Sequence, residues 1–307
     1  MRRTAVNAVY KLAKRDERVV FIGSDLGPGV LDNLKHEMPD RFFMEGISEQ
    51  YIVGMAAGMA MEGMVPYVST ISSFLTRRCY EQVVLDLCLH NVPVRLISTG
   101  AGAVYAPLGP THLAIEDIAI LRVLPNMAIV APCDALETER LMEVSLDWPG
   151  PLYIRLAKGG DPIVSQEQLP FQIGKAIPMR EPGELLFVST GVMTQVALDA
   201  AEILKSQSIQ AGVLHMHTIK PLDLEALLEG VSGVRGLVTI EEHTRAGGLG
   251  SAILETLQDA ESLPSRIARL GIPDTFAPQY GRQASLLQTW GLDAATVAAS
   301  ARKLLQS

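Results

Sequence analysis

The sequence predicts an α/β protein with two domains: a doubly wound, mostly parallel sheet followed by a smaller α/β domain. Short apolar runs alternate with stretches whose apolar residues recur at helical spacing, a pattern typical of a parallel sheet covered by helices. This alternation stops where glycines and prolines gather between residues 161 and 183, and it resumes beyond them. A chain of 307 residues is also long enough to bury two cores. We therefore expect domains at residues 1–160 and 184–307, joined by a connector at 161–183.

In the first domain, the expected strands and helices follow one another regularly along the chain. Val6, Val9 and Leu12 predict a helix over residues 4–14, ahead of a short apolar strand at 19–22. Later strands are expected at residues 42–45, 65–70, 93–98, 127–131 and 151–155. The helices between them are expected at residues 50–61, 74–90, 115–121 and 135–146. Parallel strands need such crossover helices, so this order predicts the doubly wound sheet.

The second domain repeats the alternation over a shorter stretch of chain. Its strands are expected at residues 185–189, 210–214, 236–240 and 266–270. Its helices are expected at residues 193–205, 222–229, 251–258, 283–290 and 293–305. The connector before it carries only weak strand signals, because prolines and glycines interrupt every apolar run there.

The composition argues against nucleic acid or membrane as a partner. Aromatic residues make up 5% of the chain and the formal net charge is −8, so neither base stacking nor phosphate binding is favoured. No apolar run reaches the ~18 uncharged residues that a membrane span needs. The three cysteines lack the spacing of a metal or redox motif, and no signal peptide opens the chain. We expect a soluble cytoplasmic protein.

One carboxylate stands in an unusual place, at the start of the almost wholly apolar helix expected at residues 50–61. Ser48 can cap this helix and Glu49 falls in its first turn. Burial would raise the pKa of Glu49 and favour its protonated form, whereas the helix N-terminus would lower that pKa. Such a carboxyl is suited to sharing a proton with a ring nitrogen. Taken alone, however, a Ser-Glu pair is more often simply part of a helix cap.

Two glycine-rich loops follow expected strands, which is where open α/β sheets place ligands. The first, at residues 23–29, contains Asp25, which is either a ligand contact or part of a tight turn. The second spans residues 99–112 and ends in Pro110-Thr-His112. A loop of that length after a strand is usually functional, so His112 is a candidate for substrate binding.

Taken in series, these motifs resemble the transketolase family over nearly the whole chain. The first domain and then the second carry the following motifs in the family's order: Gly23-Ser-Asp-Leu26, Gly46-Ile-Ser-Glu-Gln50, Ser73-Phe74, Gly109-Pro-Thr-His112, Glu116-Asp-Ile-Ala119, Gly150-Pro-Leu-Tyr-Ile-Arg155, Thr218-Ile-Lys-Pro221 and Glu241-Glu-His-Thr-Arg-Ala-Gly-Gly248. No single motif is specific, but a chance occurrence of all of them in register is improbable. The resemblance implies a pyrimidine-binding domain at 1–160 and a transketolase C-terminal type domain at 184–307.

The resemblance also implies thiamine diphosphate as cofactor. In this family the glutamate at the Glu49 position bonds the aminopyrimidine ring and favours the imino tautomer that deprotonates the thiazolium carbon. The resulting carbanion attacks a ketose carbonyl, and this chemistry belongs to the cofactor. Phe74 matches the aromatic residue that packs on the pyrimidine ring, although its spacing would equally suit a core residue of the next helix. Asp25 matches a residue near the thiazolium ring.

Three further positions match the family's substrate contacts. His112 matches a histidine that meets the hydroxyl and carbonyl region of the sugar, whereas a lone loop histidine is usually just exposed. Arg155 matches an arginine that holds the substrate phosphate, for which a planar fork of donors is suited. It could instead form an ion pair at a strand end. Arg2 or Arg3 matches a second phosphate-binding arginine, or else is merely exposed; we take Arg3 as the candidate.

The family's Gly-Asp-Gly…Asn motif, which holds the metal ion and the diphosphate, is absent from this chain. Gly160-Asp-Pro162 is the nearest match and lies in the expected connector. The chain thus resembles the C-terminal subunit of a split, two-gene transketolase, with no metal ligands of its own. A separate N-terminal subunit would hold Mg²⁺ or another divalent cation and complete a shared cofactor site in an α₂β₂ heterotetramer. The apolar helix at 50–61 suits packing against another subunit.

Two positions depart from ordinary transketolases. Gly100 stands where a phosphate-holding histidine is found, and Leu108 stands where an acid reads the sugar hydroxyls. Losing a group that bonds a hydroxyl removes discrimination between substrates. We expect a transferase of carbohydrate metabolism that moves a two-carbon ketol unit between sugar phosphates, one of them branched or otherwise modified, and that is active only with its partner.

Two alternatives remain open at this point. A β subunit of an α-ketoacid dehydrogenase or a deoxyxylulose-phosphate-synthase-like enzyme would share the Glu49 motif and the second domain. The run from Thr111 to Ala119 favours transketolase over the dehydrogenase subunits. The chain could also be an inactive scaffold, because a fold alone does not establish a function.

Overall fold

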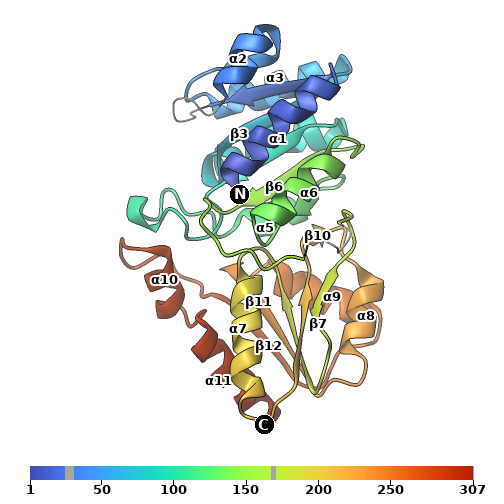
Figure 1. The fold of residues 1–307 in the computed structure, drawn as a ribbon, viewed down its shortest axis with the longest axis vertical. Helices are drawn as coiled ribbons and strands as arrows, with labels where there is room; N and C mark the ends of the chain where they lie inside the picture. The colour runs from blue at the N-terminus through green and yellow to red at the C-terminus, as the bar shows by residue number, and fades with distance from the viewer. Residues whose placement is uncertain (25–30, 167–170, 307) are drawn as a thin grey trace.

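The computed structural model describes residues 1–24, 31–166 and 171–306. Figure 1 shows two α/β domains stacked along the long axis of the molecule, the first in blue to green and the second in yellow to red. The N-terminus lies near the middle of the molecule and the C-terminus at the far end of the second domain. Both domains match the α/β architecture that the sequence predicts.

The first domain is built on a seven-stranded sheet with the strand order β10-β5-β6-β4-β3-β1-β2. The strands of this sheet that lie in the first domain are β1 (Val19–Gly23), β2 (Phe42–Met44), β3 (Val65–Ile71), β4 (Arg95–Thr99), β5 (Ala128–Val130) and β6 (Leu152–Leu156). They pair in parallel throughout. The doubly wound parallel sheet is therefore confirmed.

Helices cover both faces of this sheet. One face carries α1 (Arg2–Arg15) and α6 (Ala135–Ser145), which contact each other and share a hydrophobic core cluster. The other face carries α3 (Glu49–Met61) and α5 (Asp117–Arg122). Shorter helical segments are α2 (Asp32–Glu37), η1 (Pro39–Arg41) and η4 (Ala106–Leu108).

The segment at residues 74–90 is not the single α-helix that the sequence predicts. It consists of two π-helical segments, η2 (Phe74–Arg78) and η3 (Val83–Leu89), with the short α4 (Tyr80–Gln82) between them. Apolar spacing shows which face is buried, but it does not distinguish α from π winding over so short a run. The wider π winding is found often at functional sites.

The second domain is built on a five-stranded sheet with the order β12-β11-β8-β9-β7. Its strands are β7 (Ile177–Arg180), β8 (Leu185–Ser189), β9 (Ala211–His215), β11 (Gly236–Thr244) and β12 (Ile267–Ile272). Its helices are α7 (Met193–Lys205), α8 (Leu224–Val231), α9 (Leu249–Asp259), α10 (Gln283–Thr289) and α11 (Ala294–Gln306). The edge strand β7 comes from the expected connector and runs antiparallel to β9.

The two domains are joined more intimately than the sequence suggested. Strand β10 (Thr218–Lys220) comes from the second domain, yet it pairs antiparallel with β5 at the edge of the first sheet. One hydrophobic core cluster also runs from Ile118 and Leu121 to Leu186 and Leu249 across the seam. Among the described residues, no helix has the length and apolar character needed to cross a bilayer.

Candidate active site

Glu49 is the first residue of α3 and a buried acid of the first domain, with 2% of its surface exposed. The chain reaches it through Gly46, whose φ of +65° lies in the left-handed region that glycine tolerates best. Ser48 occupies the N-cap, but its hydroxyl donates to Glu45 O at 2.6 Å instead of capping the helix. The expected side-chain cap is therefore wrong.

Two donors satisfy the buried carboxylate. Ser24 Oγ, just beyond β1, donates to Glu49 Oε1 at 2.9 Å, and Arg78 Nη1 donates to Oε2 at 2.7 Å. Burial by itself raises the pKa of Glu49, but the hydrogen bonds from Arg78 and Ser24 outweigh it and hold that pKa below its usual value. A lowered pKa favours the ionised carboxylate, and Arg78, which the sequence did not single out, makes the largest contribution to lowering it.

Arg78 also connects Glu49 to the two aromatic candidates. Its guanidinium lies over the ring of Phe74, 4.0 Å from the ring centre. The rings of Phe74 and His112 are 5.2 Å apart between centres, in an edge-to-face arrangement. The structure thus brings together Glu49, Phe74 and His112, which come from three separate segments of the chain.

The loop that carries His112 is held in place from both domains. Arg77 Nη2 donates to the carbonyl oxygens of Thr111 and Leu113 at 3.1 and 3.2 Å. From the second domain, Glu242 Oε1 accepts a hydrogen bond from Ala103 N at 3.0 Å. A Cβ on Gly102 would lie 2.4 Å from the Glu242 carboxyl carbon, so the loop and this side chain pack closely. Arg77 was missed because it lies in no motif, and Glu242 was not singled out although it lies in the motif at residues 241–248.

Arg155 lies in the seam between the domains and is nearly fully buried. Its Nε and Nη2 bond the carboxylate of Asp117 at 2.7 and 3.2 Å. Its Nη2 also reaches Ala114 O and Glu242 O, at 3.2 and 3.0 Å. Burial opposes the charge, but Asp117 raises the pKa of Arg155 above its ordinary value. Nε and Nη2 of Arg155 are therefore engaged inside the protein, as expected for the alternative of a strand-end ion pair. The assignment of Arg155 to a substrate phosphate stays a prediction.

Two other cationic side chains, Arg3 and Lys158, are exposed near the start of α1 and the end of β6. Arg3 is exposed on α1, whereas Arg2 is half-buried. A Cβ on Gly159 would lie 3.4 Å from the main-chain nitrogen of Met1, so the start of α1 lies beside the chain that leaves β6. Lys158 is exposed on that same stretch of chain. Asp25, the remaining cofactor candidate, lies outside the described residues.

The two positions that depart from ordinary transketolases have visible structural consequences. Gly100 has φ +80°, and a Cβ there would lie 1.9 Å from the ring of Tyr105. No side chain fits at this position without moving the loop. Leu108 is 49% exposed on η4, and the ring of Tyr280 packs against the next residue, Gly109. Neither position therefore carries a polar side chain: Gly100 has none, and that of Leu108 is apolar and half-exposed.

A cluster of three buried titratable side chains lies between the two domains. Cys133, Glu137 and His215 are fully buried, and one ligand-type atom of each lies within 4.8 Å of the others. Glu137 Oε2 accepts from Cys133 N at 2.5 Å and lies 2.9 Å from His215 Nε2. These contacts make it a hydrogen-bonded link between domains.

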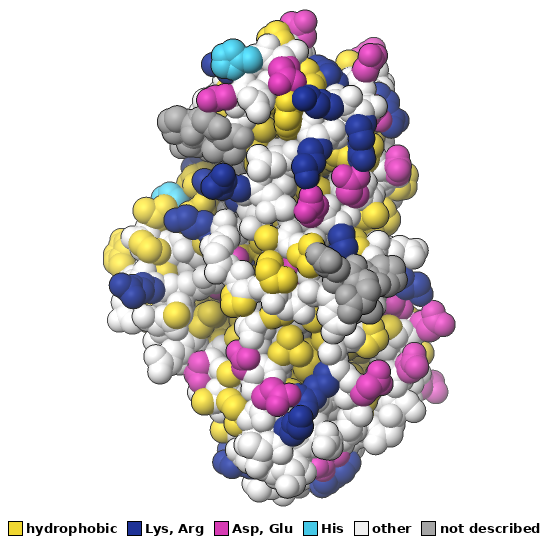
Figure 2. Space-filling view, in the orientation of Figure 1, with side chains coloured by type: hydrophobic (Ala, Val, Ile, Leu, Met, Phe, Trp, Pro, Cys, Tyr) yellow, Lys and Arg dark blue, Asp and Glu magenta, His cyan; other side chains and the backbone are white. Residues whose placement is uncertain are grey.

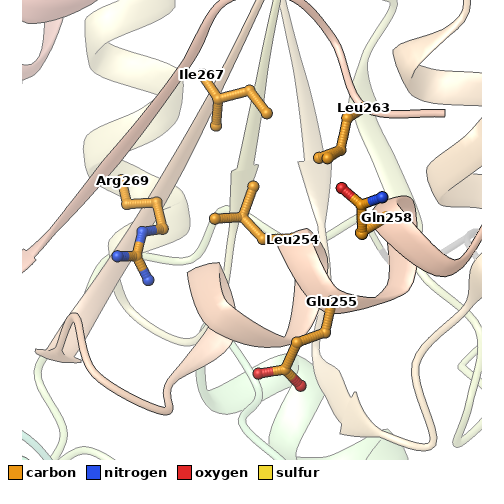
Figure 3. A pocket seen from close by; sticks show the side chains of 6 residues that line it. All are labelled: Leu254, Glu255, Gln258, Leu263, Ile267 and Arg269. Atoms are coloured by element: carbon orange, nitrogen blue, oxygen red, sulfur yellow. The ribbon is translucent and has the colours of Figure 1, made fainter. Parts of the chain in front are cut away.

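A surface hollow lies in the second domain, away from the predicted site residues. It has a volume of about 530 Å³ and lies between α9 and the edge strand β12. Figure 3 shows Leu254 at its centre, with Ile267 above it and Arg269 and Glu255 toward its rim. Glu255 is engaged by Arg122 and Arg269 by Arg245 O. None of the predicted site residues lines this hollow.

Comparison with known families accounts for both domains. The model of the transketolase pyrimidine-binding domain matches residues 1–160, and the model of the transketolase C-terminal domain matches residues 174–297. The chain belongs to the transketolase family. Families of this kind depend on thiamine diphosphate, so the resemblance that the motifs suggested is confirmed at this level.

A solved structure of the family superposes closely on the chain. It is a split-gene transketolase in the form of an inactive β4 tetramer, with a TM-score of 0.89 and 34% sequence identity. The alignment covers 99% of this chain and 97% of that one. The likeness to a split-gene β chain is thus shown for sequence and fold together.

Curated relatives fall into two groups. A transketolase family protein of Sinorhizobium fredii is 37% identical over 97% of this chain and 87% of its own length. One of the subunits of the apulose-4-phosphate transketolase of Phocaeicola vulgatus is 34% identical over 95% of this chain and 93% of its own length. A 1-deoxy-D-xylulose-5-phosphate synthase of Synechococcus is 40% identical, but the chain spans only 47% of that protein, about half its length.

Proposed function

We propose that the chain is the C-terminal subunit of a thiamine-diphosphate-dependent transketolase, a transferase that moves a two-carbon ketol unit between sugar phosphates in the cytoplasm. The observation that carries this proposal is the convergence of Glu49, Phe74 and His112 through Arg78. A buried carboxylate beside an aromatic face suits an aminopyrimidine ring, and a histidine next to it suits a sugar carbonyl.

In this proposal each residue acts in a defined place. Glu49 bonds the ring nitrogen of the pyrimidine and Phe74 packs on the ring, with Asp25 as a further contact near the thiazolium. His112, held by the 99–112 loop, orients the sugar and moves a proton at its hydroxyl. Glu49 and Phe74 would hold the cofactor, which would supply the chemistry of ketol transfer when bound. Residues 1–160 form the pyrimidine-binding domain, and residues 161–183 connect it to the domain at 184–307.

We further propose that a separate N-terminal subunit supplies the diphosphate and divalent-cation half of the site in an α₂β₂ assembly. The split-gene neighbour is an inactive β4 tetramer, and inactivity is what half a site predicts. The surface of the chain supports an interface: Ile47, Tyr51 and Met61, at and along α3, are exposed. On the face in Figure 2, apolar side chains also gather around the middle of the molecule.

The substrate side of the site supports a modified sugar. Gly100 leaves no room for a polar side chain, and Leu108 offers an apolar one. The Phocaeicola relative is named for apulose 4-phosphate, which is not one of the ordinary pentose-phosphate substrates. We take this as support for a modified sugar here. Arg3 and Lys158 are exposed cations that we assign to the substrate phosphate, and Arg155 remains the further candidate that the family resemblance implies.

A second candidate function is the condensation catalysed by deoxyxylulose-phosphate synthases, because such enzymes share up to 40% identity with this chain. Pyruvate is the distinguishing donor, since its use releases carbon dioxide whereas ketol transfer does not. Release of carbon dioxide from pyruvate and glyceraldehyde 3-phosphate by the assembled complex would favour this candidate.

The proposal is tested by calorimetry of thiamine diphosphate with Mg²⁺. The titration is run on the chain alone and on the chain purified with an N-terminal subunit that carries Gly-Asp-Gly…Asn. We expect weak or no binding by the chain alone, tight binding by the pair, and loss of that binding with Glu49→Ala. Tight binding by the chain alone would overturn the two-subunit site. Absence of binding in both would favour an inactive scaffold.

A further inference from the structure

Arg78 occupies a position that the cofactor proposal leaves unexplained. One guanidinium makes a 2.7 Å ion pair with Glu49 and lies 4.0 Å from the centre of the Phe74 ring. These are the two side chains that we assign to the pyrimidine. A flat, cationic group with N–H donors at its edge thus meets the same carboxylate and the same aromatic ring as an aminopyrimidine would.

We propose that Arg78 is a positioning residue that fills the place of the pyrimidine ring in the unliganded chain and leaves it when the cofactor binds, and that Glu49 takes up one proton from solvent in the same step. This inference rests on the proposed function, because it assigns the contested place to a thiamine ring. It adds a residue, Arg78, whose departure is coupled to the protonation of Glu49.

Arg78 and the pyrimidine ring compete for the carboxyl group of Glu49. Oε1 accepts from Ser24 and Oε2 accepts from Arg78. A carboxylate bound in this way is an acceptor only, whereas bonding a ring nitrogen that has no hydrogen requires the carboxyl to donate. Arg78 and the ring therefore need Glu49 in opposite protonation states.

Arg78 can move away from Glu49. Its side chain is 41% exposed, so it covers Phe74 from the solvent side. Within the part of the chain that the structure describes, its one hydrogen-bonding partner is Glu49. Its neighbour Arg77, by contrast, bonds Thr111 O, Leu113 O and Glu116. A half-exposed side chain with one partner swings away at small cost.

The surroundings of the Glu49 carboxyl become less favourable to its charge once Arg78 has moved away. Among the residues that the structure describes, the groups around the carboxyl are the Ser24 hydroxyl, the backbone N–H of Glu49, the Arg78 guanidinium and the Cys79 thiol. Burial, with a contribution from the Glu49 charge, raises the pKa of Cys79 to about 12, so this thiol is neutral and does not replace the lost cation. Burial then acts on Glu49 without the arginine that opposed it, and its pKa rises. The carboxylate accepts a proton from water and becomes a donor.

The test uses the complex of this chain with its N-terminal subunit, titrated with thiamine diphosphate and Mg²⁺ by calorimetry. Titrations at pH 7.5 in two buffers of different ionisation enthalpy measure the protons taken up on binding. The variants are Arg78→Gln, the charge-conserving Arg78→Lys, and Arg77→Gln as a matched control that leaves the Glu49 pair intact.

For the wild type and for Arg77→Gln we expect uptake of close to one proton. For Arg78→Gln we expect binding about tenfold tighter, equivalent to about 1.4 kcal/mol, with less proton uptake because the pKa of Glu49 is higher without the arginine. Arg78→Lys keeps the charge without the flat stacking group and should fall between the two.

Weaker binding of the cofactor by Arg78→Gln, or affinity and proton uptake equal to those of the wild type, would overturn the inference. If the wild-type complex binds no cofactor, the proposed function fails and this inference falls with it. Infrared spectra of the chain alone check the ionisation separately. In a pH titration, the protonated-carboxyl band that Glu49→Gln removes should appear at higher pH for Arg78→Gln than for the wild type, and equal midpoints would refute the protonation step.

Discussion

Two arginine–carboxylate pairs of the first domain have the same N–O distance but different roles. One lies at the proposed ligand site, and the other links the two domains. Glu49 and Arg78 are 2.7 Å apart, and so are Asp117 and Arg155. In the first pair the arginine is 41% exposed, whereas in the second the arginine is 5% exposed and the aspartate is fully buried. Residue type and distance therefore say little about which pair binds a ligand.

The surroundings separate the two pairs. Asp117 also accepts a hydrogen bond from Tyr153, and Arg155 Nη2 donates across the seam to Glu242 O. This pair is buried and bonded from several elements, which we call saturated, and it joins the domains. Burial would raise the pKa of Asp117, but Arg155 and His243 outweigh it and lower that pKa. The Glu49 pair has an exposed partner that can be exchanged. In this chain the proposed ligand site has an ion pair whose exposed arginine a ligand can displace. The structural link has an ion pair whose two partners are buried and bonded from several elements.

The largest effect expected is on the exchangeable pair. Glu49→Gln keeps the size of the side chain but removes the proton that the cofactor needs, so ketol transfer by the assembled complex should fall by about 10²- to 10⁴-fold. Steady-state assay of the complex measures this loss, with thermal unfolding as the control for folding. Activity within a few-fold of the wild type would show that the comparison has chosen the wrong carboxylate.

The saturated pair should respond through stability. Asp117→Asn leaves Arg155 as an uncompensated buried charge, so the free energy of unfolding should fall by about 3–5 kcal/mol. Urea unfolding followed by circular dichroism measures the change. Glu49→Gln should cost much less, since Arg78 can turn to solvent. Equal losses in the two variants would remove the distinction between the pairs.

A third buried link, between Glu137 and His215, sharpens the comparison through pH. Burial raises the pKa of Glu137, but His215 outweighs it and holds that pKa at about 2, below its usual 4.5. A depressed pKa stabilises the fold above the unfolded value and loses this contribution as pH falls from about 4.5 towards 2. The full contribution is about 3 kcal/mol.

His217 acts in the same direction. Burial lowers its pKa from 6.5 to about 3, so its protonation in the unfolded chain destabilises the fold as pH falls from about 6.5. Urea unfolding at pH values from 7 to 3.5 should therefore show falling stability, and Glu137→Gln should flatten the lower part of that curve. Parallel curves for wild type and variant would contradict the assignment to Glu137.

The smallest effect is expected at a pair that is exposed on both sides. Lys11 and Glu139 are 2.7 Å apart on α1 and α6, yet both are largely in solvent. Glu139→Gln should change the free energy of unfolding by less than about 1 kcal/mol. A loss as large as that of Asp117→Asn would mean that burial does not set the strength of these pairs.

Much of the fold could be predicted from the sequence because apolar periodicity reports local structure directly. Strands such as β8 and helices such as α7 fall where the pattern placed them. The pattern did not predict β10, whose three residues pair across the seam, or the π winding of η2 and η3. Both depend on contacts with distant chain, which local spacing does not contain.

The same limit applies to the candidate site. The motifs pointed to Glu49, Phe74 and His112, and the structure brings these three together. The motifs also pointed to Arg155, which is turned into the seam. Arg78 and Arg77 had no signal in the sequence, and Glu242 lay in a quoted motif without a role, because the importance of these residues comes from which neighbours they reach.

By itself the sequence determined the fold class, the family and the identity of the chemically competent side chains, since these follow from residue type and order. The tertiary structure decided which arginine stays exchangeable and which is saturated, and therefore how each carboxylate is charged. The physical reason is that a pKa and the strength of an ion pair depend on burial and on the number of neighbouring donors. Glu49 and Asp117 differ in these respects only once the chain has folded.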